Sequence, residues 1–236
     1  MLPELDIDGQ EKLLRSKVLI IGLGGLGAPL ALYLAAAGIG HLTLVDDDHV
    51  EPSNLQRQII HGTSNIGESK VISAMSSINA INPDCQVNAI QERLDREQLE
   101  RQVAQADLVL DATDNFATRY AINAACAKAG VPLVSGAAIR WEGQVAVFDF
   151  RDPESPCYAC LYPDTNATSD LSCADNGVAA PIVGIIGSIQ ALEAVKLIAA
   201  AGDSLSGYVL VMDGKYQQWQ KLQLARAEHC IGCAGR

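Results

Sequence analysis

The chain has 236 residues and a formal net charge of −11, with 49% hydrophobic and only 5% aromatic residues. This length accommodates one sizeable core, and a composition rich in small and aliphatic residues is typical of an α/β protein with a buried sheet. An acidic chain without a basic run argues against a nucleic-acid partner, because phosphate binding relies on clustered Lys and Arg.

The first elements in chain order form a β-α-β unit. Residues 1–14 are acidic and amphipathic and lack the basic and apolar regions of a signal peptide, so a cytoplasmic protein is expected. A short apolar strand at 17–21 leads into an Ala/Leu-rich helix that ends at Gly38, and a second strand follows at 41–45.

The alternation of helices and strands continues after this unit. Its expected members are a helix at 68–81, a helix at 95–105, a strand at 108–110, a helix ending at Ala129 and a strand at 132–135. We therefore predict an α/β fold, a Rossmann-like doubly wound sheet that is mostly parallel and has helices on both faces.

The pattern changes in the second half of the chain. Residues 143–150 are expected to be extended. The long polar connection that follows, at 151–177, is of the kind that is functional or mobile in compact domains. The apolar stretch at 179–200 predicts a buried helix and no membrane span, because its uncharged part is too short. A hairpin at 208–224 predicts C-terminal antiparallel strands. We expect a single domain, 1–236, with a nucleotide-binding half at 1–150 and a zinc-binding half at 151–236.

Two C-x-x-C pairs, Cys157/Cys160 and Cys230/Cys233, lie about seventy residues apart. Each pair offers two sulfurs at the right spacing, and the two together complete a tetrahedral zinc site with no open position, which indicates a structural role. Closing such a site supplies about 10–16 kcal/mol of apparent binding free energy to folding. The alternatives are unrelated cysteine pairs or disulfides, and the missing secretory signal favours metal.

A glycine-rich turn, formed by Gly22, Gly24, Gly25 and Gly27, joins the first strand to its helix. Glycine permits a tight turn and lets backbone N–H groups and the helix N-terminus approach a phosphate. Asp46 ends the next strand, where a carboxylate accepts hydrogen bonds from both ribose hydroxyls. These features predict a nucleotide, and they suit NAD and ATP equally.

The residues that follow the ribose acid favour ATP. Asn54, Arg57 and Lys70 can converge on a triphosphate, whose charge the two cations offset. Asp114 follows a strand's carboxyl end and is suited to Mg²⁺. Taken singly, Arg57 and Lys70 are solvated surface charges in the simplest interpretation, and for a lone lysine that is the better one. Their register with Asp46 and Asp114 reverses this preference. The candidate nucleotide-binding residues are Gly22, Gly24, Gly25, Gly27, Asp46, Asn54, Arg57, Lys70, Asp114 and Asn115.

The combined motifs resemble the ThiF/MoeB/HesA group, the bacterial relatives of ubiquitin-activating enzymes. The motifs are GLGGLG, Asp46, SNLQRQ, Lys70, DATDN, PLVSGAAIR and the two C-x-x-C pairs. The resemblance implies a homodimer that uses ATP to adenylate the C-terminal Gly-Gly carboxylate of a ubiquitin-like sulfur carrier, releasing pyrophosphate, and a sulfurtransferase is an optional further partner. Molybdopterin and thiamin branches share these motifs.

The resemblance also implies residue roles. ATP would be bound by Gly25, Asp46, Asn54, Arg57 and Lys70. Asp114 would hold Mg²⁺ and support catalysis together with Arg57 and Lys70. Zinc would be held by Cys157, Cys160, Cys230 and Cys233.

The other cysteines divide into one candidate nucleophile and two core residues. Cys173 lies at a position that carries a nucleophilic cysteine in some family members, and a spectator thiol is the alternative. Cys85 and Cys126 lie in apolar contexts and are expected in the core. His61 is expected to be a loop or packing residue, and Trp141 either faces a partner or packs.

One family feature has no counterpart in this sequence. Members usually begin with a helix that carries an RYxRQ-like segment, whose arginine reaches the partner subunit's ATP site. This chain starts at Met1, after the point where that segment would end. Arg15 lies close in sequence but at a different position, immediately before the first strand. The possible explanations are a start site assigned too late, a replacement cation, or a non-catalytic carrier-binding scaffold. We favour the first, because every other site residue is intact. An NAD(P)-dependent oxidoreductase is a further alternative, but it leaves Arg57, Lys70 and Asp114 unexplained.

Overall fold

The computed structural model describes residues 2–163, 177–230 and 232–233. Its strands are β1 (Lys17–Ile21), β2 (His41–Val45), β3 (Gln86–Ile90), β4 (Leu108–Asp111), β5 (Leu133–Ile139), β6 (Glu142–Phe148), β7 (Tyr208–Asp213) and β8 (Gln218–Gln223). Its helices are α1 (Asp6–Arg15), α2 (Gly27–Ala37), α3 (Lys70–Ile81), α4 (Arg96–Val103), α5 (Phe116–Ala129), α6 (Tyr158–Leu161) and α8 (Ala180–Ala199), with 3-10 turns at Pro52–Asn54 and Thr63–Asn65.

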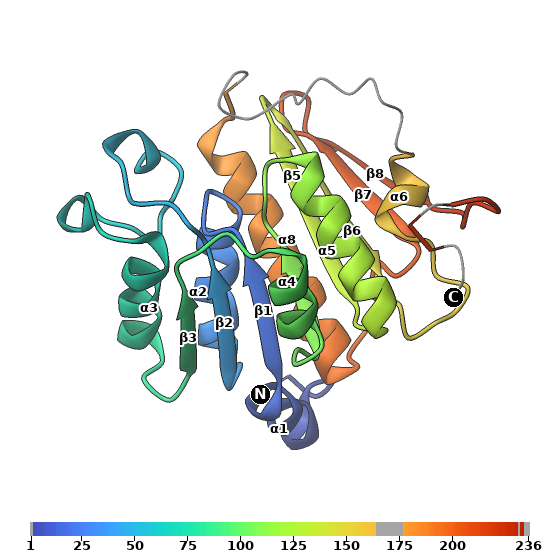
Figure 1. Ribbon diagram of the computed structural model, residues 1–236, viewed down its shortest axis with the longest axis horizontal. Helices are drawn as coiled ribbons and strands as arrows, with labels where there is room; N and C mark the ends of the chain where they lie inside the picture. Colours follow the sequence, from blue (N-terminus) through green and yellow to red (C-terminus); the bar gives the residue numbers. More distant parts are fainter. Residues whose placement is uncertain (1, 164–176, 231, 234–236) are drawn as a thin grey trace.

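All eight strands belong to one sheet, in the order β3-β2-β1-β4-β5-β6-β7-β8 (Figure 1). The strands from β3 to β5 pair in parallel, and β6, β7 and β8 are added antiparallel. This arrangement confirms the predicted fold class. The strand order reverses between β1 and β4, and such a switch point opens a crevice at the carboxyl ends of the strands.

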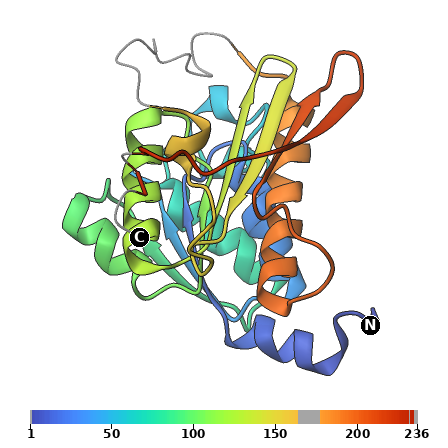
Figure 2. The same cartoon turned by 90° about the vertical axis from the view of Figure 1, so that its right-hand side faces the viewer.

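Helices cover both faces of the sheet, as expected for a doubly wound fold (Figure 2). On one face α2 packs against α3 and α8, and on the other α4 packs against α5. Each face has its own buried apolar cluster: Leu30, Leu34 and Ile186 belong to the first, and Leu99 and Ile122 belong to the second. The sheet core is therefore shielded from water on both sides.

The β-α-β unit is confirmed at its predicted positions. Three elements were missed: α1, β3 and α6. Strand β3 has a mixed pattern in which no residue is fully buried, so its sequence lacks a strong strand signal. The predicted helix at 68–81 begins later, at Lys70. The strand predicted at 132–135 extends to Ile139, because β6 pairs with it along its whole length.

Helix α8 is long and apolar enough to cross a membrane by length and composition alone, but half of it is buried within the protein. It packs on α2 and on strands β5 and β6. At Gly187 an added Cβ would lie 2.7 Å from the ring of Pro29, so glycine allows α2 and α8 to approach closely. We conclude that α8 is a core helix, as the sequence predicted.

Candidate functional site

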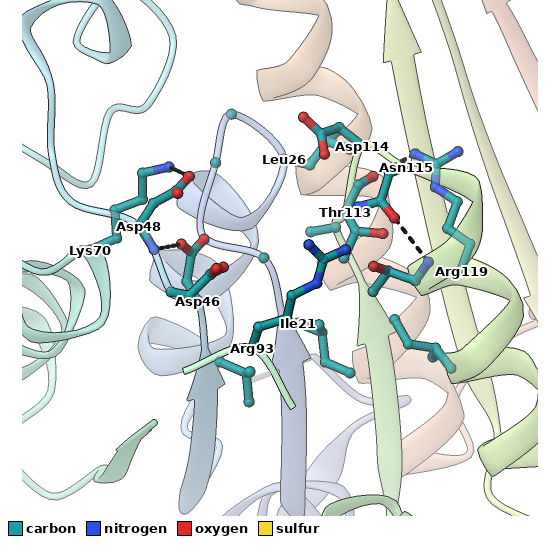
Figure 3. A pocket seen from close by; sticks show the side chains of 18 of the residues that line it. Ile21, Leu26, Asp46, Asp48, Lys70, Arg93, Thr113, Asp114, Asn115 and Arg119 are labelled. Carbon is teal, nitrogen blue, oxygen red and sulfur yellow. Dashed lines mark hydrogen bonds and ion pairs between the residues drawn. The ribbon is translucent and has the colours of Figure 1, made fainter. Parts of the chain in front are cut away.

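A cleft of about 600 Å³ opens at the carboxyl ends of β1, β2 and β4, at the point where the strand order reverses (Figure 3). Because parallel strands all end at one edge of the sheet, the loops after them meet there. The cleft lining contains nine of the ten candidate nucleotide-binding residues: Gly22, Gly24, Gly25, Asp46, Asn54, Arg57, Lys70, Asp114 and Asn115.

The tenth candidate, Gly27, lies at the start of α2 and is not among the residues that line the cleft, so its contact with nucleotide stays a prediction. A Cβ at this position would overlap the carbonyl oxygen of Gly22. Gly22 itself has a φ of +94°, a backbone conformation that residues with a side chain rarely adopt. A Cβ added at this position would lie 2.7 Å from the carbonyl oxygen of Ala112. These two glycines therefore allow the turn to fold tightly between β1 and α2.

Asp46 links the end of β2 to the glycine-rich turn. Its Oδ2 accepts a hydrogen bond from the backbone N–H of Leu23 at 2.7 Å, and its Oδ1 accepts one from the N–H of Asp48 at 3.0 Å. Burial raises the pKa of Asp46, and the nearby Lys70 ammonium opposes that shift. The carboxylate is held in a fixed orientation at the floor of the cleft.

The two candidate cations line the cleft and each contacts a polar group of the protein. Lys70 Nζ lies 2.7 Å from Asp48 Oδ2, and only 7% of its side chain is exposed. Arg57 Nη1 donates to the carbonyl oxygen of Ser53 at 3.3 Å. Asn54 is buried, and its Oδ1 accepts from the N–H of Glu51. The lysine therefore has a carboxylate partner within the protein, which the sequence did not predict.

The loop after β4 carries the remaining candidates. Asp114 is exposed where it lines the cleft. Asn115 is the N-cap of α5, because its Oδ1 accepts a hydrogen bond from the N–H of Thr118 at 2.9 Å. The structure thus gives Asn115 a helix-capping role, and its contact with nucleotide stays a prediction.

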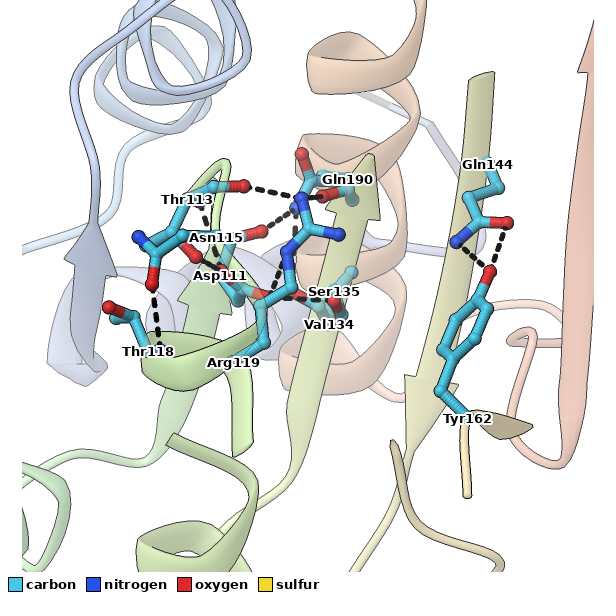
Figure 4. A network of polar contacts seen from close by, with 11 residues as sticks. Asp111, Thr113, Asn115, Thr118, Arg119, Val134, Ser135, Gln144, Tyr162 and Gln190 are labelled. Carbon is cyan, nitrogen blue, oxygen red and sulfur yellow. Dashed lines mark hydrogen bonds and ion pairs between the residues drawn. The ribbon is translucent and has the colours of Figure 1, made fainter. Parts of the chain in front are cut away.

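A buried polar network supports this loop from below (Figure 4). The carboxylate of Asp111 accepts hydrogen bonds from the backbone and hydroxyl groups of Thr113 and, at 2.7 Å, from Ser135 Oγ. Gln190 donates to the Asp111 carbonyl oxygen, and Arg119 donates to that of Thr113. Sequence reasoning missed Arg119, Ser135 and Gln190 because they come from three separate elements, and no spacing reveals that they meet.

Arg93 was also missed. It follows β3, is exposed, and lines the cleft, where Figure 3 shows its guanidinium pointing into the pocket between Asp46 and Thr113. The available signal was its place after a parallel strand, since ligands bind at the carboxyl ends of such strands. Because β3 itself was not predicted, that signal was lost.

The four predicted zinc ligands come together away from the cleft, with all Sγ atoms within 4.8 Å of one another. Three Sγ–Sγ distances are 3.5 Å for Cys157–Cys230, 3.8 Å for Cys157–Cys160 and 3.7 Å for Cys160–Cys233. Tetrahedral zinc with Zn–S bonds of about 2.3 Å requires sulfurs about 3.8 Å apart. The cluster therefore fits zinc, and all four cysteines are free of disulfides.

Of the remaining candidates, Cys85 and Cys126 are buried, which confirms their predicted core role. Cys173 lies outside the described residues. His61 is buried, with Nδ1 2.8 Å from Ser73 Oγ and Nε2 3.3 Å from the Leu23 carbonyl oxygen, so it packs under the glycine-rich turn. Burial lowers the pKa of His61.

Comparisons with known proteins show the family of the chain. The ThiF family profile matches residues 1–232. The chain is 48% identical over 236 residues to the sulfur carrier protein ThiS adenylyltransferase of Escherichia coli (strain K12), covering 100% of this chain and 92% of that protein. It is 47% identical over 233 residues to the molybdopterin-synthase adenylyltransferase of the same strain, covering 99% and 93%.

Solved structures share the fold at lower identity. The crystal structure of Escherichia coli MccB with ATP superimposes with a TM-score of 0.84 at 22% identity, covering 96% of this chain and 68% of that one. At this level of identity the likeness concerns the fold alone.

Proposed function

The chain belongs to the ThiF family, and we propose that it uses ATP and Mg²⁺ to adenylate the C-terminal Gly-Gly carboxylate of a ubiquitin-like sulfur-carrier protein. The observation that carries this proposal is the cleft in which a ribose-binding acid, two cations and a second carboxylate meet. The chain is 48% and 47% identical to two adenylyltransferases along nearly its whole length, and this similarity supports the same reaction.

The reaction needs positioning and charge neutralisation more than acid–base chemistry. A carrier carboxylate oxygen attacks the α-phosphorus, a new P–O bond forms, and the bond to the departing pyrophosphate breaks. Two anions must approach each other, so the main task of the site is to hold them in line and to offset their charge. No general base is required, because the attacking carboxylate is already ionised.

We assign the roles by position in the cleft. Asp46 binds the ribose hydroxyls, and Lys70 and Arg57 offset the charge of the triphosphate. Asp114 would hold Mg²⁺ through its hard carboxylate oxygen, and the ion, when bound, would neutralise charge on the phosphates. Asn54 adds a polar contact from the 3-10 turn.

The four-cysteine cluster has a structural role in this proposal. It joins α6 to the C-terminal segment, and four thiolates leave no open position for a substrate. We further propose a homodimer that acts in the cytoplasm, with Cys173 as a candidate nucleophile in a later sulfur-transfer step. The proposal covers both classes of carrier, because relatives named for the two pathways are similarly identical to the chain.

Carrier-dependent exchange of labelled pyrophosphate into ATP tests the proposal. We expect exchange with a thiamin-type or molybdopterin-type carrier and none when its terminal glycine is removed. Carrier binding without exchange would instead support the scaffold alternative. A change in nicotinamide absorbance with a reducible substrate would support the oxidoreductase alternative. Either of these two results would overturn the proposed reaction.

A further inference from the structure

We propose that Arg93 stacks its guanidinium on the adenine ring of bound ATP and so sets the strength of binding at the base end of the cleft. This inference rests on the proposed function, because it takes ATP as the ligand. It goes further by assigning a base-contacting residue, to which the motifs gave no role.

The position of Arg93 follows from the sheet topology. The residue lies in the loop from β3 to α4, at the same edge of the sheet as Asp46 and the glycine-rich turn. Its side chain points into the cleft (Figure 3). No hydrogen bond or ion pair joins its side chain to another described residue, so its guanidinium faces are available to a ligand.

The polarity of the cleft determines which end receives the base. Lys70 begins α3, which covers one face of the sheet. Leu99 on α4 and Ile122 on α5 line the same cleft from the opposite face, and both are buried. Asp46 lies at the end of β2, between these two sides. A nucleotide whose ribose lies at Asp46 and whose phosphates lie toward Lys70 therefore places its base on the apolar side.

Arg93 lies on that apolar side, because its loop leads directly into α4. A purine ring buries one face on apolar side chains such as Leu94 and Leu99, and its other face is free to receive a planar cation. Guanidinium groups stack on aromatic rings because the positive charge meets the electron-rich face. The strength of such stacking corresponds to about a 3- to 30-fold change in a dissociation constant.

Calorimetric binding of two ligands tests this assignment. The first ligand is Mg-ATP, and the second is Mg-ribose 5′-triphosphate, which has the sugar and the phosphates but no base. In Arg93→Ala we expect Mg-ATP binding to weaken about 3- to 30-fold and binding of the base-free ligand to change by less than about twofold. Arg93→Tyr, whose ring also stacks, should recover most of the lost affinity for Mg-ATP.

Arg96→Ala is the matched control for loss of a positive charge. Arg96 lies nearby on α4, its side chain is 88% exposed, and it pairs with Glu100 outside the cleft. We expect this variant to bind both ligands as the wild type does.

Equal weakening of both ligands in Arg93→Ala would overturn the proposal, since it would place the guanidinium on the sugar or the phosphates. An unchanged affinity for Mg-ATP would overturn it as well. If the wild type binds Mg-ATP but the Arg93 variants do not show the expected changes in affinity, the assignment of Arg93 is wrong and the proposed function is unaffected. If the wild type fails to bind Mg-ATP, the proposed function fails with it.

Discussion

Lys70 and Asp48 form an ion pair beside the cleft, with 2.7 Å between Nζ and Oδ2. The lysine side chain is 7% exposed, whereas that of Asp48 is 67% exposed, so a buried ammonium is held by a carboxylate at the surface. A phosphate that binds Lys70 shares the ammonium with this carboxylate, and the two anions repel each other. Asp48 therefore competes with the nucleotide for the cation.

The first prediction concerns this competition. Asp48→Asn should tighten Mg-ATP binding by about two- to fivefold, because a half-exposed ion pair contributes about 0–1 kcal/mol. Asp47→Asn removes the same charge from the neighbouring position and serves as the control, since within the described residues Lys70 pairs with Asp48 and not with Asp47. Calorimetric titration measures both. Weaker binding in Asp48→Asn than in the control would contradict the competition.

The second prediction tests the magnesium role of Asp114. Asp114→Asn should slow carrier-dependent pyrophosphate exchange by about 10²–10³-fold, because the charge that positions the ion is lost. Binding of ATP in the absence of Mg²⁺ should hardly change. Exchange rates measured over a range of Mg²⁺ concentrations check the assignment, and a variant with the wild-type Mg²⁺ dependence would refute it.

The third prediction concerns the cysteine cluster. Cys157→Ala should abolish stoichiometric zinc binding and lower the midpoint of thermal unfolding, because a closed zinc site contributes about 10–16 kcal/mol of apparent binding free energy in small zinc domains. Cys85→Ala removes a buried thiol outside the cluster and should keep its zinc. Metal analysis and thermal unfolding are the measurements. Full zinc content in Cys157→Ala would argue against a four-thiolate site.

The fourth prediction compares two glycines with positive φ. Gly22→Ala should lower the free energy of unfolding by about 2–4 kcal/mol, because it adds steric overlap with the Ala112 carbonyl oxygen to the backbone strain. Gly67 has a φ of +87°, but an added Cβ would meet nothing within 4 Å. Gly67→Ala should therefore cost only about 1–2 kcal/mol. Urea unfolding of the two variants measures the difference, and equal losses would show that the overlap is relieved.

The fifth prediction concerns pH. Burial lowers the pKa of His61, so below its ordinary value of about 6.5 the unfolded chain takes up a proton that the folded chain does not. The free energy of unfolding should fall as the pH decreases from 6.5 toward the lowered pKa, by at most about 1.4 kcal/mol per pH unit. His61→Gln should remove this component of the slope.

Urea unfolding between pH 5 and 8 provides the measurement. His49→Gln, a substitution of an exposed histidine, is the matched control and should keep the wild-type slope. If His61→Gln and the control have the same slope, His61 is not the group responsible. In the neutral ring Nε2 donates to the Leu23 carbonyl oxygen and Nδ1 accepts from Ser73, and protonation turns Nδ1 into a donor.

Much of the fold could be predicted because its signals are local. The turn from β1 to α2 needs glycine at Gly22, where φ is positive, and α2 ends at Gly38 in the left-handed conformation. A single glycine therefore marks each of these two boundaries in the sequence. Strand β3 could not be predicted. Its side chains are half exposed at the sheet edge, so its sequence lacks a clear hydrophobic pattern. Backbone pairing with β2 stabilises this strand.

The sequence by itself determined the parts of the site that depend on residue type and spacing: the glycine-rich turn, Asp46, Lys70, Asp114 and the two C-x-x-C pairs. Only the tertiary structure decided that Asp48 holds Lys70, that Arg119 and Gln190 support the Thr113 loop, and that Arg93 enters the cleft. The physical reason is that motifs record local geometry, whereas these contacts join side chains from separate strands and helices, which the sheet brings to one edge.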